Sequence, residues 1–354
     1  MVALRCNSVL VYTASKTSLM QRRHFLGQSA RAGFALGLLG LHACKSDSKK
    51  TDPSDQESST AGAEDEVLFQ WSLAQWSINR MIREDGLDPY AFAEKAAAWG
   101  FTGLEYVSGL YYPELEKSNF SAEAMETFVS KSLTESEKHG LQNLLIMVDG
   151  QGDLAAADAT ERAEAVTNHH KWVDAANALG CHSIRVNLNG VQEETPWKEA
   201  SVDGLKALCT YAATKNINVL VENHGGLSSK ASLLAEVMQE VGMDNCGTLP
   251  DFGNFCVRRE AGDYYESPCV EEYDIYQGIE ELMPYAKAVS AKSYDFDAEG
   301  KETKIDFYRV MEIVKSAGYS GFVGVEYEGG RLSEEEGIIA TKKLLISAAE
   351  NLKA

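Results

Sequence analysis

Basic side chains are scarce in this sequence relative to acidic ones. Lys and Arg number 33 and Asp and Glu number 53, which gives the 354-residue chain a formal net charge of −20 at pH 7. Five of the basic residues and none of the acidic ones lie within residues 1–44, so the rest of the chain carries 28 basic and 53 acidic side chains. A protein with this balance repels phosphate backbones, and we therefore expect no nucleic-acid partner.

Cysteine and proline are also infrequent, at seven residues each, and glycine is ordinary at 29. These amounts exclude a collagen, a low-complexity chain and a small disulfide-rich scaffold. No two cysteines have the C-x-x-C spacing, which argues against a zinc finger. Cys181, Cys209 and Cys246 lie in apolar contexts typical of core positions. Cys256 and Cys269 flank a loop-like insertion and could form a disulfide in an oxidising compartment.

The amino-terminal segment combines basic charge with a short apolar stretch. That stretch, residues 32–41, is too short for a permanent membrane span, which takes ~20 apolar residues. It follows Arg22-Arg23-His24-Phe25-Leu26, which is similar to the twin-arginine export signature, and it ends in Leu41-His42-Ala43-Cys44, which resembles a bacterial lipobox. The resemblance implies an export signal at 1–43 and lipidation of Cys44. A chance arginine pair and a buried cysteine are the alternative.

The export signal also implies a location and a membrane attachment. We expect a periplasmic or cell-envelope lipoprotein that contacts the membrane only through its lipid anchor. Residues 44–66 are rich in Ser, Asp, Glu and Lys and lack large apolar side chains, so we interpret them as a disordered tether. The sequence leaves the oligomeric state open, including association into a homo-oligomer.

Apolar runs alternate with helix-like segments from residue 67 onward. Several runs are nearly continuous and β-branched, as in parallel strands covered on both faces. Eight such pairs within 67–354 predict an α/β fold, a closed (β/α)8 TIM barrel. An open doubly wound sheet is the alternative, but no GxGxxG motif follows the first run. The expected strands are 69–78, 102–107, 143–148, 183–188, 218–222, 247–251, 288–296 and 322–327; the expected helices are 89–99, 121–139, 160–179, 201–215, 231–241, 274–285, 306–317 and 333–351.

Acidic residues stand toward the carboxyl ends of four of the expected strands, namely Glu105, Glu222, Asp251 and Glu326. Catalysis in a TIM barrel occurs at the carboxyl ends of the strands, and strand parity turns a carboxylate at that place into the barrel mouth. Each acid alone could form an ion pair with a barrel Lys or Arg. Three acids at one rim repel one another, and a hard divalent cation with oxygen ligands would neutralise them. The longest loop, 255–273, follows the sixth strand and is expected to cover this mouth.

The motifs Glu222-Asn223-His224, Asp251-Phe252-Gly253-Asn254 and Val325-Glu326-Tyr327 make residues 67–350 similar to the xylose isomerase-like TIM-barrel family of sugar isomerases and epimerases. The resemblance implies one divalent ion (Mn, Mg, Co or Zn) held by Glu222, Asp251 and Glu326. The family's fourth ligand, a His in a His-x-Lys motif, is replaced here by Ser290 in Ser290-Ala291-Lys292. His224 could substitute as a ligand or act only as a hydrogen-bonding group.

The resemblance also implies proton abstraction next to a sugar carbonyl, through an enediolate. Glu222 and Glu326 would exchange the proton, and Lys292 would either stabilise an enediolate oxygen or form a salt bridge with a rim acid. Sugar contacts are expected from Glu105, Asn187, His224 and Asn254, and from Trp76, which could instead be simple packing. Two other functions stay open: a lyase that opens 3-keto-glycosides by β-elimination, and a non-catalytic carbohydrate-binding lipoprotein.

Overall fold

The computed structural model describes residues 69–353. The expected signal peptide at 1–43, the lipidation site Cys44 and the tether at 44–66 lie outside the described residues. Within 69–353, none of the helices combines the length and the apolar character that a membrane crossing requires.

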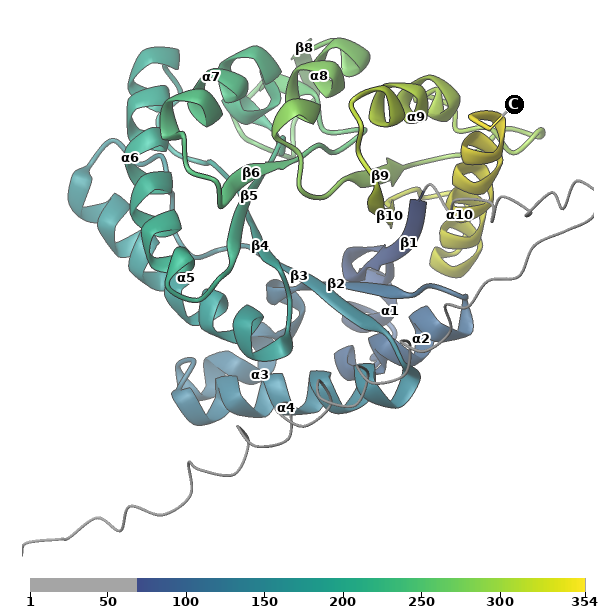
Figure 1. The fold of residues 1–354 in the computed structure, drawn as a ribbon, viewed down its shortest axis with the longest axis horizontal. Helices are drawn as coiled ribbons and strands as arrows, with labels where there is room; N and C mark the ends of the chain where they lie inside the picture. Colours follow the sequence, from purple (N-terminus) through teal and green to yellow (C-terminus); the bar gives the residue numbers. More distant parts are fainter. Residues whose placement is uncertain (1–68, 354) are drawn as a thin grey trace, which may run out of the picture. The chain divides into compact units, whose positions relative to one another are not determined.

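Eight parallel strands form the barrel that the sequence predicts (Figure 1). They are hydrogen-bonded in the order β6-β5-β4-β3-β2-β1-β10-β9. Single bridges from Thr248 to Ala286 and from Asp251 to Ser290 join the two ends of this sheet and close the barrel. The strands are β1 (Phe69–Ala74), β2 (Gly103–Val107), β3 (Gln142–Val148), β4 (Ser183–Val186), β5 (Asn218–Glu222), β6 (Cys246–Leu249), β9 (Ser290–Ser293) and β10 (Gly321–Tyr327).

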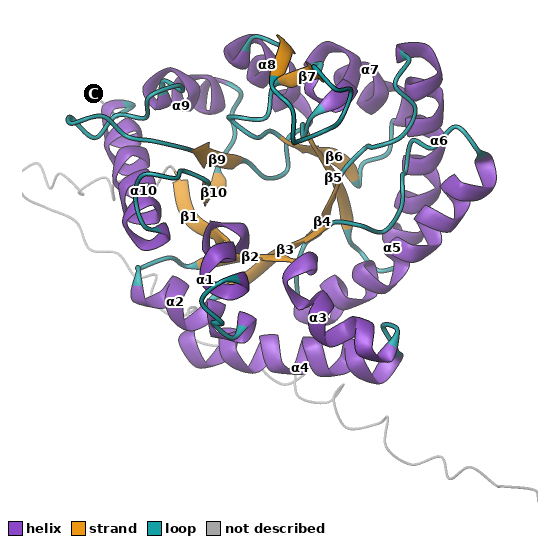
Figure 2. Ribbon diagram, turned by 180° about the vertical axis from the view of Figure 1, so that it is seen from behind, coloured by secondary structure: helices purple, strands orange, loops and turns teal. Residues whose placement is uncertain are grey.

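Helices surround the strands on the outside of the barrel (Figure 2). The α-helices are α1 (Asn79–Arg83), α2 (Phe92–Ala98), α3 (Tyr112–Leu115), α4 (Ala122–His139), α5 (Ala159–Leu179), α6 (Glu194–Ala213), α7 (Ala231–Val241), α8 (Ile275–Leu282), α9 (Phe307–Ser316) and α10 (Glu334–Asn351). Short 3-10 turns are η1 (Gln75–Ile78), η2 (Pro89–Ala91), η3 (Ser108–Tyr111), η4 (Glu116–Ser118), η5 (Gly226–Ser229) and η6 (Met283–Tyr285).

Sequence signals at the helix ends explain where the helices begin and stop. Helix α10 begins with a capping box in which Ser333 and Glu336 satisfy each other's backbone amides. Helices α4 and α5 end at Gly140 and Gly180, whose φ angles of 67° and 77° are left-handed. A residue with a Cβ would be strained there, so glycine permits the chain to leave the helix and enter the next strand.

Side-chain contacts explain the two largest errors in the predicted boundaries. The first strand ends at Ala74, because the buried amide of Gln75 accepts a bond from the Val107 amide and donates one to the Pro89 carbonyl, and the chain turns into η1. Helix α6 begins at Glu194 rather than at residue 201. Its first turn is fixed by the buried indole of Trp197, whose N–H donates to the Leu188 carbonyl at 2.9 Å.

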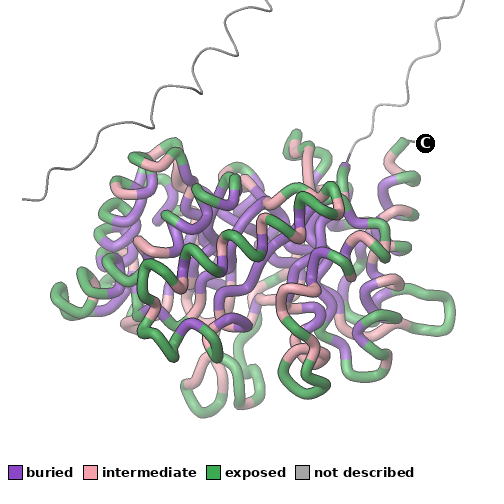
Figure 3. Tube along the Cα trace, turned by 90° about the horizontal axis from the view of Figure 1, so that it is seen from below, coloured by how far each residue is buried: buried purple, intermediate pink, exposed green. Residues whose placement is uncertain are grey.

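The apolar core fills the space between strands and helices (Figure 3). Cys181 and Cys209 are buried and Cys246 is half-buried, and all three are free thiols, as their sequence contexts predict. The inside of the barrel is different, since charged and polar side chains such as Arg185, Glu222 and Lys292 are buried there. The barrel interior is therefore polar toward its carboxyl end, where the candidate site lies.

The long insertion after β6 contains a small antiparallel hairpin of β7 (Cys256–Arg259) and β8 (Cys269–Glu272). A disulfide joins Cys256 to Cys269, which confirms the pairing that the sequence left open. We call residues 256–272 the disulfide hairpin.

Candidate metal centre

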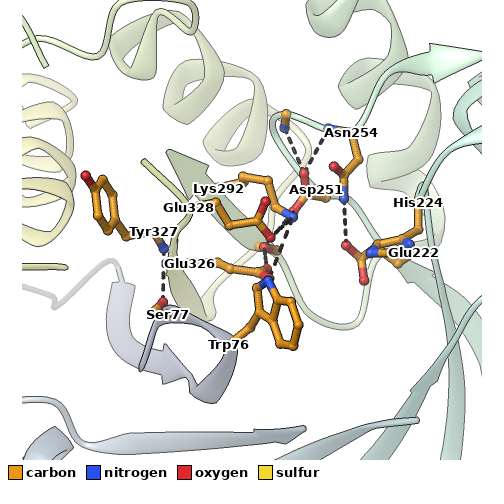
Figure 4. Close-up of polar contacts among 12 residues, drawn as sticks. Trp76, Ser77, Glu222, His224, Asp251, Asn254, Lys292, Glu326, Tyr327 and Glu328 are labelled. Atoms are coloured by element: carbon orange, nitrogen blue, oxygen red, sulfur yellow. Dashed lines mark hydrogen bonds and ion pairs between the residues drawn. The ribbon is translucent and has the colours of Figure 1, made fainter. Parts of the chain in front are cut away.

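Three carboxylates from separate strands converge inside the barrel mouth (Figure 4). Glu222 is the last residue of β5, Asp251 follows β6 by two residues, and Glu326 lies near the end of β10. One oxygen from each lies within 4.8 Å of the other two, and all three side chains are buried. The convergence that the sequence predicts is therefore present.

Ser290 stands where the resemblance implies a histidine ligand, and its side chain contacts two of these acids. Its hydroxyl is 2.9 Å from Asp251 Oδ2 and 2.8 Å from Glu326 Oε2. A hydroxyl has one proton to donate, so it can satisfy only one of two ionised carboxylates. Asp251 Oδ1 is held separately by the backbone amides of Gly253 and Asn254, at 2.8 and 2.9 Å.

Lys292 reaches between the same carboxylates. Its ammonium lies 3.6 Å from both Asp251 Oδ2 and Glu326 Oε1 and 3.0 Å from Glu328 Oε1, and only 1 % of the side chain is exposed. Burial opposes the charge, but the surrounding acids, Asp251 first, hold the pKa of Lys292 well above its usual value. The salt bridge that the sequence offered as one role of Lys292 is thus formed.

Arg185 on β4 is the second buried cation of the site. Its Nε lies 2.7 Å from Glu222 Oε2, and its Nη1 donates to Asp149 Oδ1 at 2.7 Å. The contact between Arg185 Nε and Glu222 Oε2 is an ion pair that lacks the geometry of a hydrogen bond. Neither of these two atoms has a hydrogen-bond partner. The other oxygen of Glu222 accepts from the Asn254 side chain at 3.0 Å.

The negative charges of the site exceed the positive ones. Two cations, Arg185 and Lys292, face five acids: Asp149, Glu222, Asp251, Glu326 and Glu328. Burial is the main cause that raises the pKa of Glu222 and of Glu326. Burial also raises the pKa of Asp251 well above its usual value, although the nearby charge of Lys292 acts to lower it.

A divalent cation fits this donor set. Hard ions such as Mg²⁺ and Mn²⁺ prefer carboxylate oxygens. Glu222 Oε2 is buried without a hydrogen bond, and the five acids leave three negative charges that the two cations do not balance. Glu222, Asp251 and Glu326 therefore form a group that could hold a metal ion.

A cavity of about 890 Å³ opens above the carboxylates. The predicted residues that line it are Trp76, Asn187, His224, Asn254, Lys292 and Glu326, while Glu222 and Asp251 are buried just outside the lining. The disulfide hairpin supplies further wall residues, among them Arg259, Tyr264 and Tyr265. The expectation that the insertion covers the mouth is borne out.

His224 does not join the carboxylate group among the described residues. Its Nδ1 lies 2.9 Å from the hydroxyl of Tyr265, which corresponds to the hydrogen-bonding role. Burial, Arg185 and Lys292 lower the pKa of His224 to about 4, so the ring is neutral at physiological pH. Asn187 is held in place through its side-chain amide, which donates to Asp149 Oδ1 at 2.9 Å.

The predicted sugar contact of Glu105 is wrong. Strand β2 continues two residues beyond it to Val107, so Val107 lines the main cavity and Glu105 lies deeper in the barrel. Glu105 accepts a 2.6 Å bond from the Ser72 hydroxyl and lines a second cavity of about 370 Å³ beside Tyr319. Burial raises the pKa of Glu105 to about 7.

Two acids of the site were not predicted. Asp149 follows β3 directly, which is the same pattern that identified Asp251, and Glu328 lies two residues beyond Glu326 with the same strand parity. Both line the main cavity. Although burial opposes ionisation, Lys292 keeps the pKa of Glu328 below its usual value, and Arg185 does the same for the pKa of Asp149.

A family model for the xylose isomerase-like TIM barrel matches residues 93–348. This chain belongs to that family. The membership confirms the resemblance to this family that the sequence motifs indicated. No curated protein sequence matches the chain. Solved structures of similar fold include proteins named as epimerases, a probable dehydratase and an endonuclease.

Three solved structures illustrate the similarity of fold. L-ribulose 3-epimerase has a TM-score of 0.60 at 12% identity and covers 80% of this chain and 97% of its own. D-psicose 3-epimerase from Clostridium cellulolyticum H10, solved with D-tagatose, has a TM-score of 0.55 at 13% identity, covering 80% and 98%. The zinc-bound IOLI protein has a TM-score of 0.58 at 16% identity, also covering 80% and 98%.

Proposed function

We propose that this xylose isomerase-like barrel is a metal-dependent isomerase or epimerase of a sugar. The observation that carries the proposal is the convergence of Glu222, Asp251 and Glu326 beneath a cavity of about 890 Å³. Structural relatives that are named as sugar 3-epimerases support the same reaction class.

Glu222, Asp251 and Glu326 would hold the ion. Related structures contain zinc in the IOLI protein and magnesium in a barrel from Mycobacterium smegmatis, and we propose a divalent ion of this kind here. When bound, it would polarise the sugar carbonyl and stabilise the negative charge that develops when the adjacent proton is removed.

Two carboxylates could exchange the proton. Glu222 is on the fifth barrel strand and Glu326 on the eighth, so the two approach a substrate from different sides. One would remove the proton next to the carbonyl and the other would return it to the opposite face, which inverts the carbon. Lys292, which lines the cavity, would donate hydrogen bonds to the sugar oxygen that becomes negative.

The remaining lining residues would orient the hydroxyl groups. Asn187 and Asn254 offer amide groups that both donate and accept. Neutral His224 can hydrogen-bond a hydroxyl without adding charge, since its pKa is lowered to about 4. Trp76 presents an aromatic ring, which suits the apolar C–H face of a sugar.

One observation favours a second function, β-elimination from a 3-keto-glycoside. A cavity of about 890 Å³ lies near the upper end of the ~300–1,000 Å³ in which proteins bind drug-sized ligands, and it exceeds what one monosaccharide fills. The same base would remove the proton next to the 3-keto group. The electron pair would then expel the glycosidic oxygen, which takes up a proton and leaves with its substituent.

Incubation in D2O separates these reactions. Free ketoses should gain deuterium at the carbon next to the carbonyl if the protein is an isomerase or epimerase, and 3-keto-glycosides should release their substituent if it is a lyase. Glu326→Gln should reduce either rate by ~10²–10⁴-fold, whereas the exposed control Glu335→Gln should not. A metal-loaded protein that binds sugars but catalyses neither reaction would support the non-catalytic alternative instead.

Export and anchoring belong to the same proposal. Support comes from the Arg22-Arg23 pair, the apolar stretch before Cys44 and the disulfide between Cys256 and Cys269, because disulfides persist in oxidising compartments. The protein should incorporate radiolabelled fatty acid and partition with membranes, and Cys44→Ala should abolish both. Labelling that survives this substitution would exclude Cys44 as the anchor.

A further inference from the structure

The disulfide hairpin is anchored across the barrel mouth. The Tyr264 hydroxyl lies 3.2 Å from both the amide nitrogen and the carbonyl oxygen of Gly190, in the loop after β4. Its ring covers Gly226, where a Cβ would lie 2.7 Å from a ring carbon. The hairpin, which follows β6, thus reaches across to the loops that follow β4 and β5. The ring of Tyr264 leaves no room for a residue larger than glycine at Gly226.

Internal bonds hold the hairpin in shape. The guanidinium of Arg259 donates to the carbonyls of Tyr264 at 2.9 Å and Ser267 at 2.6 Å, and the disulfide joins the two strands. Asp263 Oδ1 accepts from the Tyr265 amide at 3.0 Å. The wall is therefore preorganised, which reduces the ordering cost of binding a ligand against it.

Tyr265 lies in the cavity wall, on the hairpin that these internal bonds hold in shape. Its ring packs edge-on against His224 at a centroid distance of 5.1 Å, and its hydroxyl contacts His224 Nδ1 at 2.9 Å. It lines the cavity, yet 50% of the residue is exposed. Val270, at 48%, is the other exposed large hydrophobic residue among residues 69–353, and it lies on the same hairpin outside the cavity lining.

We propose that Tyr265 is the stacking platform of an outer subsite that binds a second ring, joined to the reacting sugar through its glycosidic oxygen. This inference rests on the second proposed function, β-elimination from a 3-keto-glycoside, because a sugar that is locked as a glycoside has no free anomeric carbonyl. It narrows the substrate class to glycosides that carry a second ring. The reacting ring would occupy the inner end near Glu326 and Lys292, and the second ring would lie against Tyr265 at the mouth. Sugar and aryl rings both offer an apolar face to an aromatic side chain.

Calorimetric titration of the metal-loaded protein tests the subsite without requiring turnover. The probes are matched methyl glycosides, phenyl glycosides and disaccharides in the gluco, galacto and xylo series. The wild-type protein should bind at least one two-ring probe about tenfold tighter than its methyl partner, the size of a favourable aromatic contact. Tyr265→Ala should remove this preference, Tyr265→Phe should keep it because the ring remains, and Val270→Ala should leave it unchanged.

The outcomes separate the subsite from the reaction. Equal affinity for one-ring and two-ring probes, or a preference that survives Tyr265→Ala, overturns the subsite. Deuterium exchange into free ketoses together with equal affinities would leave the proposed function standing without the subsite. A preference that depends on Tyr265 in a protein that catalyses neither reaction would leave the subsite standing alone. A protein that binds none of the probes overturns the subsite, and the D2O assays then decide the proposed function separately.

Discussion

At the scale of single residues, Ser290 is the departure from the family pattern that matters most. The serine hydroxyl lies between Asp251 and Glu326, within 3 Å of an oxygen of each, and the neighbouring ammonium of Lys292 is 3.6 Å from both acids. The short side chain of Ser290 therefore contacts both acids through its hydroxyl, at the position where the resemblance to the family implies a histidine ligand.

Ser290→Ala should lower the free energy of unfolding by about 1–3 kcal/mol, because it removes the donor shared by two buried carboxylates. Chemical denaturation of the metal-free protein measures this. The matched control is Ser201→Ala, since Ser201 is equally buried and its hydroxyl has no hydrogen-bond partner. If both substitutions cost the same, the contacts of Ser290 contribute nothing beyond packing.

Glu105 should make the protein less stable as the pH rises. Burial raises the pKa of Glu105 to about 7 in the folded state, whereas an exposed Glu titrates near 4.5. Between these values the folded state binds the proton more tightly, so stability falls as the pH increases from about 4.5 to about 7. The total loss is on the order of 3 kcal/mol.

Glu105→Gln should remove the part of the pH dependence that Glu105 causes while keeping the side-chain shape. The part due to Glu222, Asp251 and Glu326, whose pKa values burial also raises, should remain. Urea denaturation at several pH values between 4.5 and 8, compared with the exposed control Glu94→Gln, is the measurement. A variant whose stability falls with pH as steeply as that of the wild type would show that another group is responsible.

At the scale of elements, helix α10 packs on β10 through a glycine. A Cβ at Gly337 would lie 2.2–2.3 Å from three ring carbons of Tyr327, whose side chain is fully buried. Gly337→Ala would gain up to ~1 kcal/mol of helix propensity. The clash costs typically ~1–3 kcal/mol and should win, because the buried ring has no free space.

Thermal denaturation of Gly337→Ala should therefore show a lower Tm than the wild type. An alanine at Glu335, exposed on the same helix, serves as the control and should change the Tm little. A higher Tm for Gly337→Ala would mean that the helix can move away from Tyr327 at no cost.

The elements themselves were largely predictable, because hydrophobic pattern and capping residues act locally. All eight barrel strands and the main helices lie where apolar runs and helical periodicity place them. The exceptions depend on contacts between distant residues. Gln75 ends β1 by bonding to Val107 and Pro89, and Trp197 fixes an earlier start of α6.

Site residues could be predicted from the sequence where an acidic side chain comes at the end of an apolar run. Glu222, Asp251 and Glu326 follow apolar runs and were found, while Asp149 has the same pattern outside the family's motifs and was missed. Glu105 was placed wrongly because it was treated as a rim residue, although it lies two residues before the end of its strand and therefore deeper in the barrel. The salt bridge of Lys292 with rim acids was one of the two roles that the sequence offered. The ion pairs of Arg185 with Asp149 and Glu222 arise only when the barrel closes and were not predicted.

At the scale of the whole molecule, barrel closure brings together acids that lie about a hundred residues apart in the chain. In a chain with a net charge of −20, placing five of the 53 acidic residues in one buried region requires compensation beyond Arg185 and Lys292. A divalent ion would supply that compensation and also the Lewis acidity that the proposed sugar isomerase would need.

The stoichiometry of bound metal tests this account most directly. Elemental analysis of protein purified without chelator should find close to one divalent ion per chain, and the double variant Glu222→Gln, Asp251→Asn should lose it. The exposed control Glu335→Gln should retain it. A folded wild-type protein that contains no metal and shows no affinity for Mn²⁺, Mg²⁺, Co²⁺ or Zn²⁺ would contradict the account, because protons alone would then balance the buried charge.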